Sequence, residues 1–186
     1  RASVLYKRQF DIYKIGVGPS SSHTNGPMIA GYHFTRLIES NLAKVVRIQV
    51  DLYGSLSLTG IGHHTDRATI LGLLGNKPDT IKIASANRAM RKAMDEKILS
   101  VDGRHEIEFN YQTDMVFHEK NLPLHENGMT ITALDAQGEQ IGFETYYSIG
   151  GGFIATADEL QNGSATGPIA VVFPFYSANE MVAKAE

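Results

Sequence analysis

The sequence predicts an α+β fold on the basis of two observations. Apolar residues recur at helical spacing in three segments between residues 27 and 99, whereas short alternating segments joined by turns dominate the last third of the chain. Helices and hairpins that are separated along a chain favour an α+β arrangement over a doubly wound parallel sheet. We therefore expect helices packed on a sheet.

Three helices are expected in the first part of the chain. The first begins at Pro27, a residue that suits the first helical turn, and continues to about residue 39. The second covers 65–74, where apolar residues line one side, and ends at the turn-forming residues 75–78. The third covers 86–99 and is amphipathic and rich in Lys and Arg, which is typical of a solvated face.

The clearest strand covers 45–53, where apolar and polar residues alternate. A short strand is also expected at 80–83. In the last third, turn residues separate the strand candidates, and the link at 135–138 predicts a hairpin. These candidates cover 107–109, 114–117, 129–134, 140–149 and 171–176, and a helix begins near residue 178.

The composition indicates one globular domain and excludes several functions. The chain has 186 residues, 42% of them hydrophobic, with a net charge of −3 and a pI near 6.2. This balance excludes a disordered chain and gives no support for nucleic-acid binding. No apolar run reaches the ~20 residues that cross a bilayer and the residues from Arg1 show no signal-peptide pattern, so we expect a cytoplasmic protein without membrane contact. Because cysteine is absent, this chain alone cannot ligate an iron–sulfur cluster or offer a thiol nucleophile.

The first polar segment with candidate chemistry is G-P-S-S-S-H-T, residues 18–24. It precedes the first predicted helix, whose N-terminal N–H groups attract a carboxylate or phosphate. The alternative is a simple helix cap, which needs only one of the hydroxyls. On this segment alone the two interpretations stay open. The candidate binding residues are Ser20, Ser21, Ser22, His23 and Thr24.

The second segment is G-I-G-H-H-T-D, residues 60–66. Adjacent histidines diverge in a strand and at a helix start, so they are not expected to share a metal ion. A single imidazole near a helix N-terminus suits a general base. The alternative, favoured on this segment alone, is that Thr65 or Asp66 caps the helix and the histidines lie at the surface.

Two later segments complete the set of candidates. The first, L-P-L-H-E-N-G at 122–128, contains an Asn-Gly turn, so His125 and Asn127 are either site residues or ordinary loop residues. The second, Y-Y-S-I-G-G-G-F at 146–153, has three glycines that permit close approach of a ligand or form a bulge. Ser148 lacks the G-x-S-x-G context of a hydrolase nucleophile. The remaining histidines, His33, His105 and His118, are expected to be structural or on the surface.

Taken together, these segments resemble one family. They are, in order, F-D-I-Y-K-I-G-V-G-P-S-S-S-H-T, Y-G-S-L-S-L-T-G-I-G-H-H-T-D, N-L-P-L-H-E-N-G-M and Y-Y-S-I-G-G-G-F. They are similar to the β chain, or N-terminal β domain, of iron–sulfur-dependent L-serine dehydratase. The resemblance implies a mixed sheet with helices packed on it, similar to the allosteric substrate-binding domain of phosphoglycerate dehydrogenase. It implies a disordered leader at 1–9, the β domain at 10–176, and the start of a linker helix toward an α domain at 177–186.

The resemblance also implies an activity and its partners. The family converts L-serine to pyruvate and ammonia without pyridoxal phosphate, using a [4Fe–4S] cluster that three cysteines of an α domain or α subunit hold. A homodimer is expected. Because this chain has no cysteine, the cluster ligands must lie outside it, and the chain alone is expected to be inactive. The alternative is a non-catalytic module that binds L-serine for allosteric control or assembly.

The resemblance assigns roles to individual residues. His63 is the candidate base for the α-proton, and His64 is the weaker choice. Residues 20–24 would hold the substrate carboxylate or amino group, or line the cavity beneath the cluster. The same pocket would be lined by His64, Thr65, Asp66, His125, Asn127, Ser148, Gly150 and Gly151.

Overall fold

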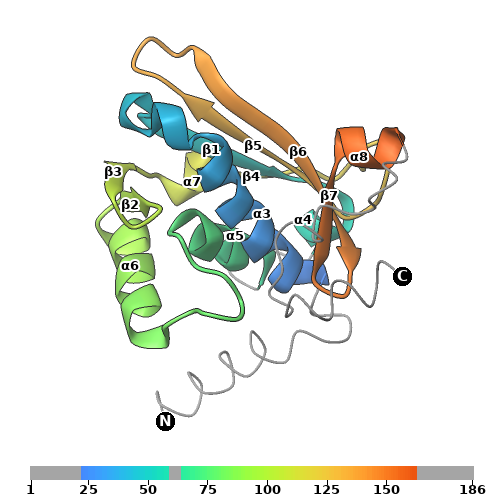
Figure 1. Cartoon of the computed structure of the whole chain (residues 1–186), viewed down its shortest axis with the longest axis horizontal. Helices are drawn as coiled ribbons and strands as arrows, with labels where there is room; N and C mark the ends of the chain where they lie inside the picture. Colours follow the sequence, from blue (N-terminus) through green and yellow to red (C-terminus); the bar gives the residue numbers. More distant parts are fainter. Residues whose placement is uncertain (1–21, 59–63, 163–186) are drawn as a thin grey trace.

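The chain forms a mixed five-stranded sheet with helices packed against it, as seen in a computed structural model that describes residues 22–58 and 64–162 (Figure 1). The predicted α+β class is therefore confirmed. The elements are α3 (Asn25–Leu37), η1 (Glu39–Lys44), β1 (Arg47–Leu52), α4 (Gly54–Leu58), α5 (Thr65–Leu73), α6 (Ile83–Asp95), β2 (Ile98–Val101), β3 (His105–Glu108), α7 (Tyr111–Asp114), β4 (Met115–Phe117), β5 (Gly128–Leu134), β6 (Gln140–Gly150), β7 (Phe153–Thr156) and α8 (Ala157–Gln161).

The sheet has the order β4-β1-β5-β6-β7. β1 and β4 run parallel, and every other neighbouring pair in this sheet is antiparallel. The alternation that predicts β1 places Ile48, Val50 and Leu52 in the core, where each is fully buried. β5 and β6 form the predicted hairpin, closed at Asp135 and Gly138.

The core lies between the sheet and α3, and α3 packs on β6 and β7 (Figure 1). α5 packs against another side of α3. The two helices approach closely at Gly31 and Gly72. A Cβ atom at Gly72 would lie 2.1 Å from the carbonyl oxygen of Met28, so only glycine fits this crossing.

The helices α3 and α5 run in the same general direction. Lys77, just after α5, places its Nζ 5.3 Å from the ring centre of Tyr32, in the second half of α3. The backbone N–H of Asp102 donates to Leu73 at the end of α5, and the Asp102 carboxylate pairs with Arg36 near the end of α3. The C-terminal ends therefore lie together, and both helices begin on the same side of the molecule (Figure 1).

Two local predictions are wrong. The expected strand at 80–83 is a turn that leads into α6, which begins at Ile83. The expected helix at 86–99 ends at Asp95, because Lys97 takes a left-handed φ of 59° and residues 98–101 form β2. β2 pairs with β3 in a separate two-stranded sheet that packs on α6, so Leu99 belongs to this hairpin.

Further elements were not expected from the sequence. The Gly/Ser-rich stretch after β1 forms the short helix α4, and β7 and α8 follow the glycines at 150–152. The capping box of Thr156 and Glu159 begins α8. The predictions for residues 1–9, the strand at 171–176 and the helix near 178 lie outside the described residues. In the part of the chain that the structure describes, no helix is long and apolar enough to cross a membrane.

Candidate functional site

Four buried polar side chains each have at least one side-chain atom without a hydrogen-bond partner among the described residues. These side chains come from the start of α3, from the end of β6 and from the loop before β5. They are Thr24, Asn25, Asn127 and Ser148, with fractional exposures of 0%, 0%, 9% and 2%. We call this group the polar chamber.

The backbone brings the members of the polar chamber together. Ser148 lies against Gly26 in the first turn of α3, where a Cβ atom would be 2.1 Å from Ser148 Oγ. The backbone N–H of Ser148 donates to the carbonyl oxygen of Asn127 at 2.9 Å. Ser148 thus joins the start of α3 to the loop that precedes β5.

Thr24 does not serve as a helix cap. It occupies the N-cap position of α3, but its side chain makes no capping hydrogen bond within the described residues. Its hydroxyl is fully buried and unpartnered. A buried polar group without a partner costs about 1–3 kcal/mol, so a group of them is a feature that the fold alone does not explain. Thr24 therefore does not support the alternative that this segment is a simple helix cap.

His23 connects the chamber to α4. Its Nδ1 lies 2.9 Å from Ser22 Oγ, and its Nε2 lies 3.1 Å from the carbonyl oxygen of Ser55. The imidazole is therefore held between two segments that are 32 residues apart. Ser20 and Ser21 lie outside the described residues, so their predicted binding role stays a prediction.

The loop at 118–127 packs against the start of α4 through main-chain hydrogen bonds. Gly54 N donates to Lys120 O, and Ser55 N donates to Glu126 O, each at 2.9 Å. Gly54 has a φ of +53°, and a Cβ atom there would lie 2.3 Å from Glu126 O, so this close approach requires glycine. Within the loop, His125 Nδ1 accepts from Asn127 N at 3.0 Å.

The start of α5 carries the second predicted segment. His64 occupies the N-cap position without a side-chain capping bond among the described residues, and Thr65 is buried behind it. Asp66 is fully buried; its Oδ1 accepts from Arg67 N at 2.8 Å and its Oδ2 accepts from the Tyr111 hydroxyl. The carboxylate therefore accepts from one N–H of the first turn of α5, but His64, and neither Thr65 nor Asp66, occupies the N-cap position that the capping alternative gave to one of these two residues. His63 lies outside the described residues.

The glycines after Ser148 form the turn between β6 and β7. Gly150, Gly151 and Gly152 have φ values of 95°, 63° and 78°, and the pairing of β6 with β7 shifts between Ser148 and Gly150. The bulge predicted as an alternative is thus present. The pocket-lining role of Gly150 and Gly151 stays a prediction.

The three histidines that were expected to be structural or on the surface all have partners. His33 Nδ1 lies 2.5 Å from Tyr146 OH, and burial lowers the pKa of His33 to about 4. His105 Nε2 lies 2.7 Å from Val45 O. His118 Nε2 lies 2.8 Å from Asp51 Oδ1, and its ring stacks on Tyr53 at 4.3 Å between ring centres.

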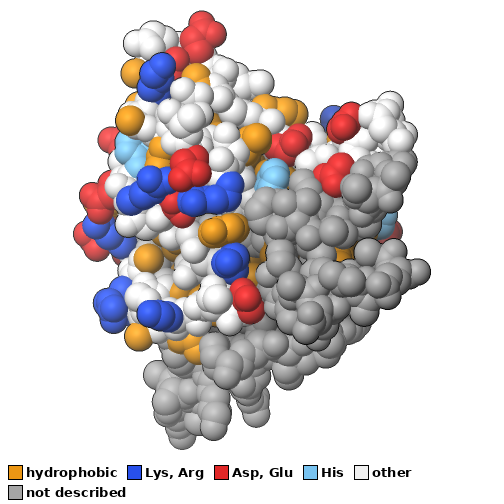
Figure 2. Space-filling model, viewed as in Figure 1, with side chains coloured by type: hydrophobic (Ala, Val, Ile, Leu, Met, Phe, Trp, Pro, Cys, Tyr) orange, Lys and Arg blue, Asp and Glu red, His pale blue; other side chains and the backbone are white. Residues whose placement is uncertain are grey.

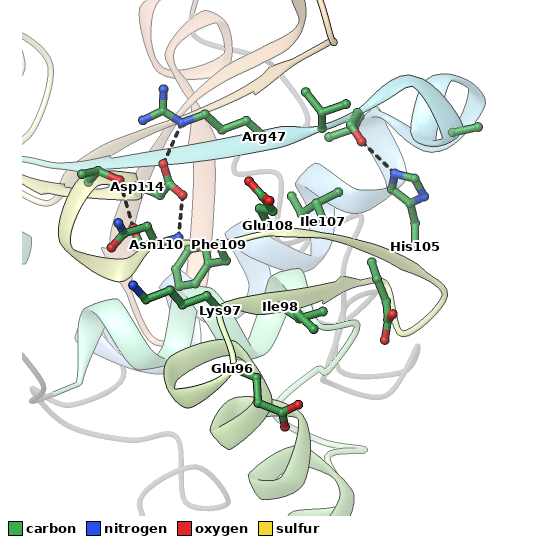
Figure 3. A pocket seen from close by; sticks show the side chains of 15 residues that line it. Arg47, Glu96, Lys97, Ile98, His105, Ile107, Glu108, Phe109, Asn110 and Asp114 are labelled. Carbon is green, nitrogen blue, oxygen red and sulfur yellow. Dashed lines mark hydrogen bonds and ion pairs between the residues drawn. The ribbon is translucent and has the colours of Figure 1, made fainter.

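A groove of about 880 Å³ lies apart from these residues, between the start of β1, the end of α6 and β3 (Figure 3). Arg47 Nε pairs with Asp114 Oδ1 at 2.7 Å in its wall, and Asn110 N donates to Asp114 Oδ2 at 2.8 Å. None of the residues predicted as site residues lines this groove. We therefore do not regard it as the candidate site.

The charges on the surface and the side chains that could hold a metal ion also limit the possible chemistry. Over α6 and the β2–β3 hairpin, basic and acidic side chains alternate (Figure 2), and Lys92 pairs with Glu106, which fits the predicted solvated face. Among the described residues, no three His, Cys, Asp or Glu side chains are placed to hold a metal ion. The absence of cysteine from the whole chain means that its residues do not fit a thiolate-ligated cluster.

Asn25 is the one chamber residue that sequence reasoning missed. It follows the G-P-S-S-S-H-T segment directly, but a polar residue at the first position of a helix is common and does not by itself indicate a binding site. Burial of both its amide atoms without a partner appears only in three dimensions.

Comparison with known proteins agrees with these motifs. The family model described as serine dehydratase beta chain matches residues 8–159. This chain belongs to the serine dehydratase beta chain family. It is 50% identical over 177 residues to L-serine dehydratase 1 of Escherichia coli K12, a match that covers 94% of this chain and 38% of the relative.

Other relatives give the same result. L-serine dehydratase 2 of Escherichia coli K12 is 52% identical over 92% of this chain. An L-serine dehydratase of Helicobacter pylori 26695 is 41% identical, also over 92% of this chain. The chain spans 38% of the length of each of these relatives. The predicted family is therefore confirmed, and the likeness to the phosphoglycerate dehydrogenase domain stays a prediction.

Proposed function

We propose that this serine dehydratase beta chain forms the substrate-binding half of an L-serine dehydratase, which converts L-serine to pyruvate and ammonia. The observation that carries the proposal is the polar chamber, because its buried and unpartnered groups are what a small polar substrate requires. The relatives named L-serine dehydratase supply the identity of that substrate.

The chamber suits the carboxylate end of L-serine. It lies at the N-terminal end of α3, a 13-residue helix whose first N–H groups carry a partial positive charge. The Thr24 hydroxyl and the Asn25 amide add hydrogen-bond donors at the same helix end. A carboxylate bound there would give partners to groups that have none in the described part of the chain.

The base that removes the α-proton is assigned to His63 on the family motif, since His63 lies outside the described residues. Removal of this proton lets the Cα–H electron pair form a double bond to Cβ while the Cβ–O bond breaks. The hydroxyl takes up one proton, which balances the proton that the base removes, and leaves as water, so the product is 2-aminoacrylate. This enamine tautomerises to an imine, and one water hydrolyses the imine to pyruvate and ammonia. A neutral imidazole near a helix N-terminus suits the first step.

The [4Fe–4S] cluster of the family is assigned to an α domain or α subunit, because the residues of this chain do not fit it. The chain alone is accordingly proposed to be inactive, and the enzyme is proposed to need both parts.

Anaerobic pyruvate formation from L-serine tests the proposal. The chain alone is compared with the chain joined to, or mixed with, the cysteine-bearing part, after reconstitution with iron and sulfide. Activity in the combined sample only is the expected result. If the combined sample contains an intact cluster and produces no pyruvate, the proposal is wrong. Binding of L-serine without turnover in that sample would instead favour a module for allosteric control or assembly.

A further inference from the structure

Behind the polar chamber, a second contact joins α3 to β6. The Tyr146 hydroxyl lies 2.5 Å from His33 Nδ1, and the two rings meet edge to face with centres 5.3 Å apart. Tyr146 is fully buried, so its hydroxyl cannot exchange this partner for water. A buried phenol usually keeps a hydrogen-bond partner, because an unpartnered buried hydroxyl destabilises the fold.

The protonation states of the pair are set by burial. Burial lowers the pKa of His33 to about 4, so the imidazole is neutral at pH 7. Burial, and to a lesser degree Glu144, raises the pKa of Tyr146, so its phenol stays protonated. The contact is therefore a hydrogen bond between neutral groups at pH 7.

The Tyr146–His33 contact and the Ser148–Gly26 contact lie on the same faces of β6 and α3. Tyr146 and Ser148 are two residues apart on β6, so both side chains point to the same face of the sheet. Gly26 and His33 are seven residues apart on α3, which is two helical turns, so both lie on the same face of the helix. β6 therefore meets α3 at two points, with Ser148 at Gly26 and Tyr146 at His33.

The two contacts differ in what they fix. The contact between Ser148 and Gly26 has no side-chain hydrogen bond among the described residues, because Ser148 Oγ has no partner. The contact between Tyr146 and His33 is directional and fixes the position of β6 along α3. A shift of β6 by a fraction of an ångström would move Ser148 Oγ relative to Thr24 and Asn25.

We propose that Tyr146 and His33 are positioning residues, which hold Ser148 at the distance from the start of α3 that L-serine binding requires. This inference rests on the proposed function of the chamber. Loss of the hydrogen bond would weaken substrate binding rather than remove a reacting group, so KM would rise while kcat changed little.

The test uses the combined enzyme and a matched control on the next residue. Tyr147 points to the other face of β6, and its hydroxyl bonds to the main chain at Leu124, so Tyr147→Phe also removes one phenol hydrogen bond. We expect Tyr146→Phe to raise the KM for L-serine about tenfold with kcat within about threefold of wild type. Tyr147→Phe is expected to leave KM within about twofold. Equal KM values for the two variants would overturn the inference.

Rescue at the partner position separates positioning from folding. His33→Gln keeps an acceptor and a donor near the Tyr146 hydroxyl, whereas His33→Leu keeps neither. We expect near-wild-type KM for His33→Gln and a KM increase like that of Tyr146→Phe for His33→Leu. Identical KM values for both His33 variants would contradict the inference. An inactive wild-type enzyme in the same assay would instead contradict the proposed function.

Discussion

Ser148 occupies the space that a side chain at position 26 would need. A Cβ atom at Gly26 would lie 2.1 Å from Ser148 Oγ and 3.0 Å from Ser148 Cβ. The start of α3 and the end of β6 therefore come together only because residue 26 is glycine. This contact sets where Ser148, one residue of the polar chamber, lies relative to the start of α3.

Replacement of Gly26 by alanine is expected to separate α3 from β6. Overpacking of this kind costs about 1–3 kcal/mol of the free energy of unfolding and would displace Ser148, so pyruvate formation by the combined enzyme should fall. Gly138→Ala is the control, because the described structure has no heavy atom within 4 Å of that Cβ position. Its φ of 78° gives Gly138→Ala a cost in stability of about 1 kcal/mol, with no loss of activity. Full activity of Gly26→Ala would show that the contact does not matter.

Thr24→Val should leave the chain as stable as wild type, or more stable by about 1 kcal/mol, because it removes a buried hydroxyl without a partner. Thr69→Val provides the contrast. Thr69 is equally buried, but its hydroxyl donates to Thr65 O at 2.7 Å, so its loss should cost about 1 kcal/mol. Urea unfolding of the two variants measures the difference. A clear loss of stability in Thr24→Val would mean that its hydroxyl has a structural partner.

The stability of the chain should fall as the pH is lowered from 6.5 towards 4. Burial lowers the pKa of His33 from 6.5 to about 4, so in this range the unfolded chain binds a proton that the folded chain does not. The His33 contribution is fully present above pH 6.5 and is lost as the pH falls. The loss amounts to about 2–3 kcal/mol.

Urea unfolding at pH 7 and pH 4.5 measures this loss in wild type and in His33→Gln. The variant has no imidazole at position 33, so its stability should change less between the two pH values. A wild type and a variant with the same pH dependence would show that His33 does not titrate with a lowered pKa.

His63 and His64 should differ in their effect on turnover. His63→Ala is expected to lower kcat of the combined enzyme by about 10²–10⁴, the usual contribution of a general base. His64→Ala is expected to lower kcat less, because His64 is the weaker candidate for the base. It should also leave the fold intact, since His64 makes no capping hydrogen bond at α5 within the described residues. The assay is anaerobic pyruvate formation, with circular dichroism as the check on folding. A kcat for His63→Ala close to that of wild type would remove His63 from the role of base.

Periodicity predicted the parts of the fold whose pattern reflects a single packing partner. β1 alternates because one face of the strand meets the core, whereas the β5–β6 hairpin was predictable from the turn residues that join its strands. The pattern failed at residues 86–99, where apolar residues continue at helical spacing past Lys97. The chain reverses there through a left-handed residue, and the apolar residues beyond it pack in a hairpin instead.

The site was predictable in its motifs and not in its geometry. The segments at 18–24 and 146–153 stood out by their hydroxyls and glycines, and the structure joins them through Ser148 and Gly26. Asn25 and the contact between Tyr146 and His33 depend on which side chains are buried together. Such pairings between segments about 113 residues apart leave no local pattern in the sequence.

The most direct test of the central claim is the kcat/KM for L-serine of the combined enzyme carrying Thr24→Val and Ser148→Ala. Both hydroxyls are buried and unpartnered in the described structure, so their removal should leave folding intact. If the polar chamber binds L-serine, kcat/KM should fall by about 100-fold or more while the urea midpoint of the chain is unchanged or higher. A kcat/KM within about twofold of wild type would contradict the claim that this chamber is the substrate site.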